Sequence, residues 1–248
     1  MTDIVTADQA RRDGSIRRLA EAMVSPDSYG SVLLLIVITY VLSVTLTQPW
    51  SRSVVLLVQI GTVWLALHAS RARRGVRVLA SMVLVVAGGV AIGSLVWSTG
   101  SIATQIVFST SALLYFIAPL SILRAIVMQR TVSRETVLGA IDAYLLIGMF
   151  FAYVYQALGA IGSEPLFEGG VDPTISQSLF FSFTTLTTTG YGNLVPAANP
   201  GQTFAVMEML IGQLFLITAV AKVINAWRPE RWRAAETEVE PRSEGGTP

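Results

Sequence analysis

The chain has 248 residues, of which 52% are hydrophobic and only 13% are charged, whereas soluble domains carry roughly 25% charged residues. This composition excludes a soluble globular protein and predicts an integral membrane protein with a single membrane domain. The net charge is only +1. The sequence has no cysteine, which excludes disulfides and cysteine-based metal sites. It has a single histidine, His68, which excludes histidine clusters.

Residues 1–28 are polar and lack the apolar core of a cleavable signal peptide, so they are predicted to form a cytoplasmic N-terminal segment. Apolar stretches long enough to cross a hydrocarbon core, which takes about 20 residues, then follow. The six such stretches are 29–47, 53–70, 76–97, 103–123, 136–158 and 202–225. A seventh apolar stretch, 174–186, is too short to cross and predicts a re-entrant helix. The predicted fold is an all-α membrane protein with six transmembrane helices.

Basic residues concentrate in alternate connections. The basic clusters lie at 11–18, 71–77, 124–134 and 222–233. The remaining connections hold no basic residue except Arg52. Because cytoplasmic flanks retain Lys and Arg, this pattern predicts a multi-pass protein of the cell membrane with both termini in the cytoplasm. We interpret 71–77 as a topology anchor, with binding of anionic lipid head groups as the alternative.

The strip Thr188-Thr189-Gly190-Tyr191-Gly192 follows the re-entrant stretch directly. Backbone that is not helical is tolerated at membrane depth only where protein buries it or where it lines a cavity. Gly190 and Gly192 permit positive φ, so successive carbonyl groups can turn to one side. Four such strips around an axis would replace the water shell of a cation with rings of carbonyl oxygen.

This strip, flanked by a short helix and two spans, resembles the selectivity filter of the potassium channel family. The resemblance implies that the carbonyl groups of Thr188, Thr189, Gly190 and Tyr191 coordinate K⁺. It also implies that the Thr188 hydroxyl forms the innermost ring and that Gly192 shapes the outer mouth. One strip per chain implies a homotetramer.

Two residues depart from the family pattern. Thr189 stands where valine or isoleucine is usual, and Asn193 replaces the aspartate that commonly follows the motif. Both substitutions can alter the hydrogen bonds that support the filter. Glu208, a buried acid that needs a partner, is predicted to lie behind the re-entrant helix and to support the filter as well.

The resemblance divides the chain into a four-helix transmembrane domain, a pore domain and a polar tail. Their bounds are 29–134, 135–227 and 228–248, and the tail is predicted to be disordered. The pore domain comprises an outer helix at 136–158, a pore helix at 173–187, the filter at 188–192 and an inner helix at 202–226. We expect Asp172 to cap the pore helix and Pro173 to occupy its first turn. The acids Glu164, Glu168 and Asp172 are interpreted as attracting cations to the mouth, with ordinary polar loop filler as the alternative.

The inner helix carries two further candidates. Gly212, in the middle of the span, is either a gating hinge or a point of close helix packing. Lys222 and Asp142 of the fifth span lie at similar distances from the cytoplasmic face, and we hypothesise an ion pair between them near the gate.

The fourth span tests the analogy with voltage-gated channels, which share this layout. A voltage sensor needs several arginines at three-residue spacing within the membrane, and 103–123 contains none. Pro119 is expected to kink this helix. We therefore expect a structural role for the first four helices, without voltage gating.

The predicted function is passive conduction of K⁺, with no enzyme activity and no cofactor besides the permeant ion. Alternatives are a poorly selective monovalent cation channel, a potassium uptake subunit and a non-conducting partner or sensor subunit. The uptake subunit is disfavoured because such proteins usually carry four unequal filter copies in one chain. No metal, nucleotide or nucleic-acid motif is present in the sequence.

Overall fold

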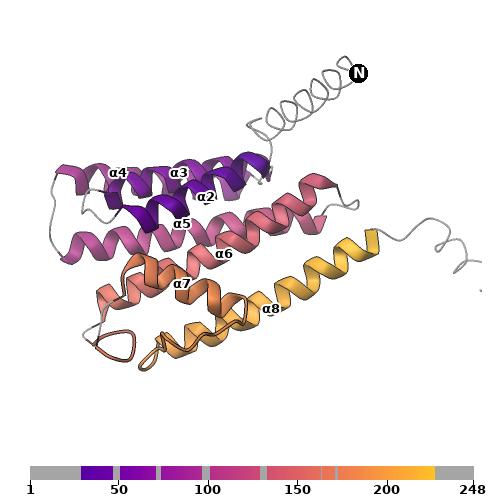
Figure 1. Ribbon diagram of the computed structural model, residues 1–248. Coiled ribbons are helices and arrows are strands. Elements are labelled where there is room, and N and C mark those ends of the chain that lie inside the picture. The colour runs from indigo at the N-terminus through magenta and orange to yellow at the C-terminus, as the bar shows by residue number, and fades with distance from the viewer. Residues whose placement is uncertain are drawn as a thin grey trace, which may run out of the picture.

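The computed structural model describes residues 29–46, 51–70, 74–96, 101–128, 133–162, 164–170 and 173–226, and this part of the chain is helical apart from its connections (Figure 1). The helices are α2 (Tyr29–Thr45), α3 (Ser51–Ala69), α4 (Arg74–Val96), α5 (Ser101–Met128), α6 (Arg134–Ile161), α7 (Ile175–Leu186) and α8 (Gly201–Ala226). Each apolar stretch of the sequence therefore corresponds to one helix.

Three helices are long and apolar enough to cross a membrane, counted over the described residues. They are Thr104–Met128 within α5, Arg134–Ile161, which is α6, and Gly201–Lys222 within α8. The stretches Tyr29–Thr45 and Val54–Ala69 are apolar but shorter. The chain is thus a helical membrane protein, while a crossing by all six long stretches stays a prediction.

Helices α5 and α6 form the middle of the molecule and pack along each other (Figure 1). On one side, α2 and α3 lie against this pair and α4 contacts α3 and α5. On the other side, the short helix α7 lies between α6 and α8. The strip of interest therefore follows a helix held on both flanks.

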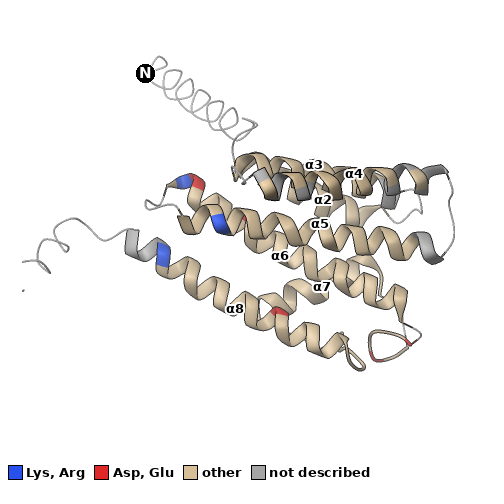
Figure 2. Cartoon of the chain, turned by 180° about the vertical axis from the view of Figure 1, so that it is seen from behind, with Lys and Arg blue, Asp and Glu red and all other residues tan. Residues whose placement is uncertain are grey.

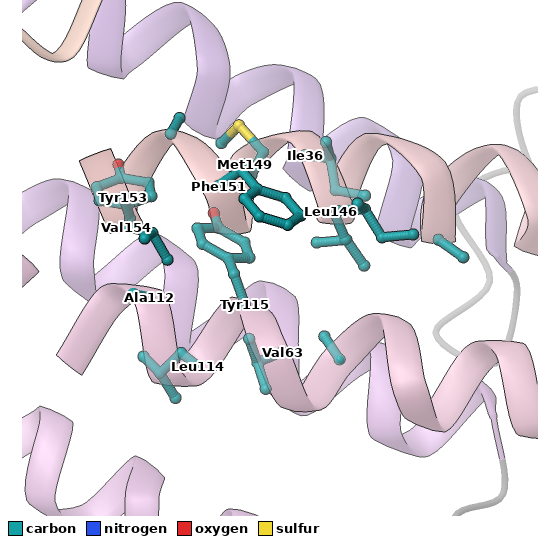
Figure 3. Packing of buried hydrophobic residues seen from close by; sticks show 14 of the residues in the cluster. Ile36, Val63, Ala112, Leu114, Tyr115, Leu146, Met149, Phe151, Tyr153 and Val154 are labelled. Atoms are coloured by element: carbon teal, nitrogen blue, oxygen red, sulfur yellow. The ribbon is translucent and has the colours of Figure 1, made fainter. Parts of the chain in front are cut away.

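Aliphatic and aromatic side chains fill the space between α2, α3, α5 and α6 (Figure 3). The rings of Tyr115 and Tyr153 stack with centroids 5.6 Å apart, and Phe151 and Leu146 are almost completely buried beside them. Lipid tails are as apolar as these side chains, so close packing, more than exclusion of water, holds such helices together.

The bounds of the two central helices differ from the predicted ones by about a turn. α6 begins two residues before the predicted outer helix, because Ser133 and Thr136 form a capping box at its start. α5 continues to Met128 with Pro119 inside it, so the proline does not end the helix.

Apart from Asp142 in α6 and Glu208 in α8, the charged side chains that the structure describes lie toward the two ends of the bundle (Figure 2). Lys and Arg lie where α5 and α8 end and where α6 begins, whereas the connection after α6 carries acidic residues. The charge asymmetry of the sequence is therefore present in space. Which end faces the cytoplasm stays a prediction.

Candidate functional site

Helix α7 begins with a capping box formed by Thr174 and Gln177. The Thr174 hydroxyl accepts a hydrogen bond from the Gln177 N–H at 3.3 Å, and the Gln177 carbonyl oxygen Oε1 accepts one from the Thr174 N–H at 2.9 Å. The predicted start at Pro173 was therefore wrong by two residues, since the helix begins at Ile175. Asp172, the predicted cap, lies outside the described residues, and the observed cap is Thr174.

The strip after α7 alternates between two backbone conformations. Thr188, Gly190 and Gly192 have φ of 56°, 53° and 77°, and the residues between them do not have positive φ. A left-handed conformation is uncommon for a β-branched residue such as Thr188 and marks a constrained site. Alternation of this kind allows successive carbonyl groups to face the same side.

Hydrogen bonds fix the strip to the end of α7. The Thr184 carbonyl accepts from the N–H groups of Thr189 at 2.8 Å and Gly190 at 3.1 Å. The Thr188 hydroxyl donates to the carbonyl of Thr187 at 2.7 Å, and the Thr189 hydroxyl lies 2.9 Å from that of Thr187. The unusual hydroxyl at Thr189 thus has a partner within its own chain.

In the outer half of the strip, Tyr191 contacts α7, and the connections beyond the strip contact each other. The Tyr191 ring stacks on Phe180 with centroids 5.8 Å apart, although 71% of Tyr191 is exposed in the single chain. Beyond the strip, Phe167 and Pro196 form a bridge between the two outer connections. Asn193 is exposed and forms no hydrogen bond with the described residues, so its supporting role stays a prediction.

Glu208 joins three helices behind the strip. Its carboxyl oxygens accept from the Tyr155 hydroxyl of α6 at 2.7 Å and from the Ser182 hydroxyl of α7 at 2.5 Å. Ser182 is also 2.7 Å from the Gly148 carbonyl, and Glu208 is completely buried. A buried acid is costly unless it is hydrogen-bonded, and these partners meet that need. The structure thus places Glu208 against α7, away from the strip itself.

One face of α6 holds α7 at both of its ends. The Gln156 amide donates to the Pro173 carbonyl and to the Ser178 hydroxyl, both at 2.7 Å, and the Tyr144 hydroxyl donates to the Leu186 carbonyl at 3.2 Å. Neither Gln156 nor Tyr144 was among the residues predicted from the sequence. The available signal was their polarity within an apolar span, at positions that share a helix face with Gly148.

Gly212 lies where α8 crosses the end of α7. A Cβ atom at this position would lie 2.4 Å from the Leu186 carbonyl oxygen and 2.8 Å from a Leu186 methyl group. The close approach accounts for the glycine through packing, one of the two roles considered. The hinge role stays a prediction.

The expected ion pair between Asp142 and Lys222 does not form within the described chain. The Lys222 ammonium donates to the Ile126 carbonyl of α5, while neither carboxyl oxygen of buried Asp142 has a hydrogen-bond partner. Similar depth along two helices did not place the two side chains on facing surfaces.

The acidic residues of the outer connection have mixed outcomes. Glu164 and Glu168 are exposed, as a role in attracting cations requires. Asp172 lies outside the described residues. No group of three or more His, Cys, Asp or Glu side chains that could hold a metal ion occurs among the described residues.

Comparisons with known proteins agree with the location of the site. Residues 140–228 match the family model described as "Ion channel". The voltage-gated delayed rectifier potassium channel KCNH5 of Homo sapiens, and its counterparts in Mus musculus and Rattus norvegicus, are 33% identical to this chain over 86 residues. These alignments cover 31% of this chain and 9% of each relative, so the chain spans only a small part of the relatives' length. No solved structure gives a significant match. The matches confirm the resemblance and point to a channel and not to an enzyme.

Proposed function

We propose that the chain is one subunit of a K⁺-selective channel that conducts K⁺ passively, because residues 140–228 match an ion-channel family model and the similar curated proteins are potassium channels. Four chains surround one axis, and the carbonyl groups of Thr188, Thr189, Gly190 and Tyr191 coordinate the ion. The Thr188 hydroxyl forms the innermost ring, and Gly192 shapes the mouth. All six long helices cross the cell membrane, with both termini in the cytoplasm.

The observation that carries this proposal is the alternation of backbone conformation from Thr188 to Gly192. A bare monovalent cation needs several oxygen ligands in place of its hydration shell, and backbone carbonyls on one side of an extended strip supply them. Positive φ at every second residue is the conformation that such a strip requires.

The surroundings of the strip suit a cation. The C-terminal end of α7 leads into the strip, and the carbonyl end of a helix carries partial negative charge. Glu164 and Glu168 are exposed in the outer connection and would raise the local concentration of cations at the mouth. We propose that Glu208 supports the filter through α7, because its hydrogen bond to Ser182 reaches the middle of that helix.

Weak or absent voltage dependence is also part of the proposal. The span expected within α5, from Ala103 to Leu123, contains no arginine, so few charges would move through the field. The relatives are named as voltage-gated, and that property is theirs. The first four long helices would then act as a structural collar in contact with membrane lipids.

Flux measurements on purified protein in liposomes test the proposal. We expect K⁺ flux, a reversal potential that follows the K⁺ gradient in mixtures of K⁺ and Na⁺, and little change with voltage. A reversal potential that ignores the K⁺ gradient would favour a poorly selective channel, the alternative suggested by Thr189. Absence of any flux would favour a non-conducting partner subunit.

Two glycine variants provide the matched comparison. Gly190→Ala forces a Cβ atom onto a residue with φ of 53° in the strip, and we expect K⁺ flux to be lost. Gly169→Ala imposes the same kind of strain at φ of 90° in the outer connection, with equally open surroundings, and should retain flux. Equal flux from both variants would argue against conduction through the strip.

A further inference from the structure

A cavity lies at the end of the bundle where α2 and α6 finish and α3, α5 and α7 begin. Its volume is about 520 Å³, within the range of roughly 300–1,000 Å³ that is common for small-molecule sites. None of its lining residues belongs to α8 or to the strip 188–192, so it is separate from the proposed ion pathway.

The lining of the cavity is mainly apolar with several polar side chains, and it carries no charged side chain among the described residues. Side chains with hydroxyl or amide groups come from four longer helices and from the start of α7; they are Ser43, Gln59, Thr104, Ser111, Tyr153, Gln156, Thr174 and Ser176. Apolar side chains, including Val55 and Phe108, make up most of the remainder. A charged head group would therefore find no counter-ion there, whereas an uncharged polar group would find hydrogen-bond partners.

Gln59 lines the cavity and is the residue that most strongly indicates a bound ligand. It is completely buried, and neither its amide nitrogen nor its amide oxygen has a partner within hydrogen-bond geometry, although the Tyr153 hydroxyl is close by. Buried amides are nearly always hydrogen-bonded, since an unmet donor or acceptor is costly. The hydroxyls of Ser43 and Tyr153 lie 3.2 Å apart and form a second polar point of the same wall.

The first turn of α7 closes the cavity on the side of the pore helix. Thr174, Ile175 and Ser176 all line it. The N-terminal end of a helix carries partial positive charge, so it favours an oxygen that accepts hydrogen bonds. The lining thus combines an amide that lacks a partner, a hydroxyl pair and a helix N-terminus around an apolar interior.

We propose that this cavity binds a small, uncharged amphiphile with a hydrocarbon body and one hydroxyl or carbonyl oxygen. The hydrocarbon body contacts Val55 and Phe108, and the oxygen bonds with the Gln59 amide or the first turn of α7. This site concerns the helical scaffold, and binding there does not depend on whether the strip conducts ions.

Photolabelling of the full chain in liposomes tests the site. The probe is octanol that carries a diazirine group, and peptide mass spectrometry locates the adducts. We expect adducts on residues that line the cavity, reduced by excess octanol but not by octanoate at the same membrane concentration. Adducts spread evenly over lipid-facing residues such as Leu57 would show simple partition into the bilayer and would overturn the proposal.

Three variants sharpen the test. Gln59→Leu removes the amide at similar volume and should reduce labelling roughly tenfold, the effect of about one hydrogen bond. Val55→Phe fills the cavity without touching the amide and should reduce labelling as well. Leu57→Phe adds a ring on the same helix at a position that is 45% exposed, and labelling should stay unchanged.

The outcomes are separable. If Gln59→Leu does not fold, Val55→Phe against Leu57→Phe still decides the question. Unchanged labelling in Val55→Phe would show that the cavity holds no probe. Because labelling is read without any ion current, a failure of K⁺ conduction and a failure of this site are distinguishable.

Discussion

Helices α6 and α8 are both long and apolar, but the chain covers them very differently. Of the most apolar part of each, 56% is buried inside the chain for α6 and 22% for α8. α6 packs against α2, α5, α7 and α8, whereas α8 packs against α6 and α7 and reaches α5 through Lys222. One helix is a central support, and the other has most of its surface uncovered.

This difference indicates where a single chain is incomplete. Leu210, Leu214 and Ile217 are 58%, 62% and 57% exposed, and their spacing puts them on one face of α8. In the proposed tetramer, neighbouring subunits, the ion pathway and lipid would share this uncovered surface. The family match likewise suggests an oligomer.

The largest expected effect comes from changing the uncovered face of α8. Replacing Leu210, Leu214 and Ile217 together with serine removes apolar contact surface, and we expect the tetramer to dissociate. The measurement is cross-linking and size-exclusion chromatography in mild detergent.

A matched triple change on α2 is the control for that experiment. Leu34, Val37 and Val41 are similarly exposed, at 52%, 47% and 48%, and their spacing likewise puts them on one helix face. Their replacement with serine should leave the tetramer in place. If both triple variants lose it, or neither does, the contrast between α8 and the rest of the chain has no bearing on assembly.

The second prediction concerns the best-connected residue of α8. Glu208→Ala removes both hydrogen-bonded oxygens and leaves the Tyr155 hydroxyl without its partner, so we expect the free energy of unfolding to fall by about 2–4 kcal/mol. Denaturation by SDS, followed by tryptophan fluorescence, measures the loss. Glu208→Gln keeps the volume and should lose less, about 1 kcal/mol. Met209→Ala, at the neighbouring exposed position, is the control. If Glu208→Ala lowers the free energy of unfolding no more than Met209→Ala does, the hydrogen bonds of Glu208 do not stabilise the fold.

The sequence predicted the helices well because the length and apolar composition of each span are visible in the sequence itself. Positive φ at Gly190 and Gly192 was also expected, because glycine adopts it readily, while the role of this strip in lining an ion pathway stays a prediction. It did not predict Tyr155 and Ser182 as partners of Glu208. Helices that are apolar on all sides give no sign of their rotation, so contacts between them remain undetermined. The Thr174 cap, in contrast, was available, because Thr174 and Gln177 have capping-box spacing.

The third prediction separates the two roles of Gly212. If packing explains this glycine, Gly212→Ala pushes a Cβ atom against the Leu186 carbonyl and lowers the free energy of unfolding by about 1–3 kcal/mol. Gly88→Ala is the control, because a Cβ atom added to Gly88, inside α4, would meet no neighbouring atom within 4 Å. That change should be neutral or stabilising by up to about 1 kcal/mol. A Gly212→Ala protein with unchanged stability but altered channel opening would favour the hinge.

The smallest expected effect concerns Asp142 and Lys222. Lys222 bonds to the Ile126 carbonyl and Asp142 has no hydrogen-bond partner within the described chain, so the two side chains should act independently. A double-mutant cycle with Asp142→Asn and Lys222→Met should give a coupling energy below about 0.5 kcal/mol, the level at which separate sites are additive. The cycle is measured by SDS denaturation of the four proteins. A larger coupling would contradict independent action and would mean that the two side chains influence each other through the packing of α5 against α6.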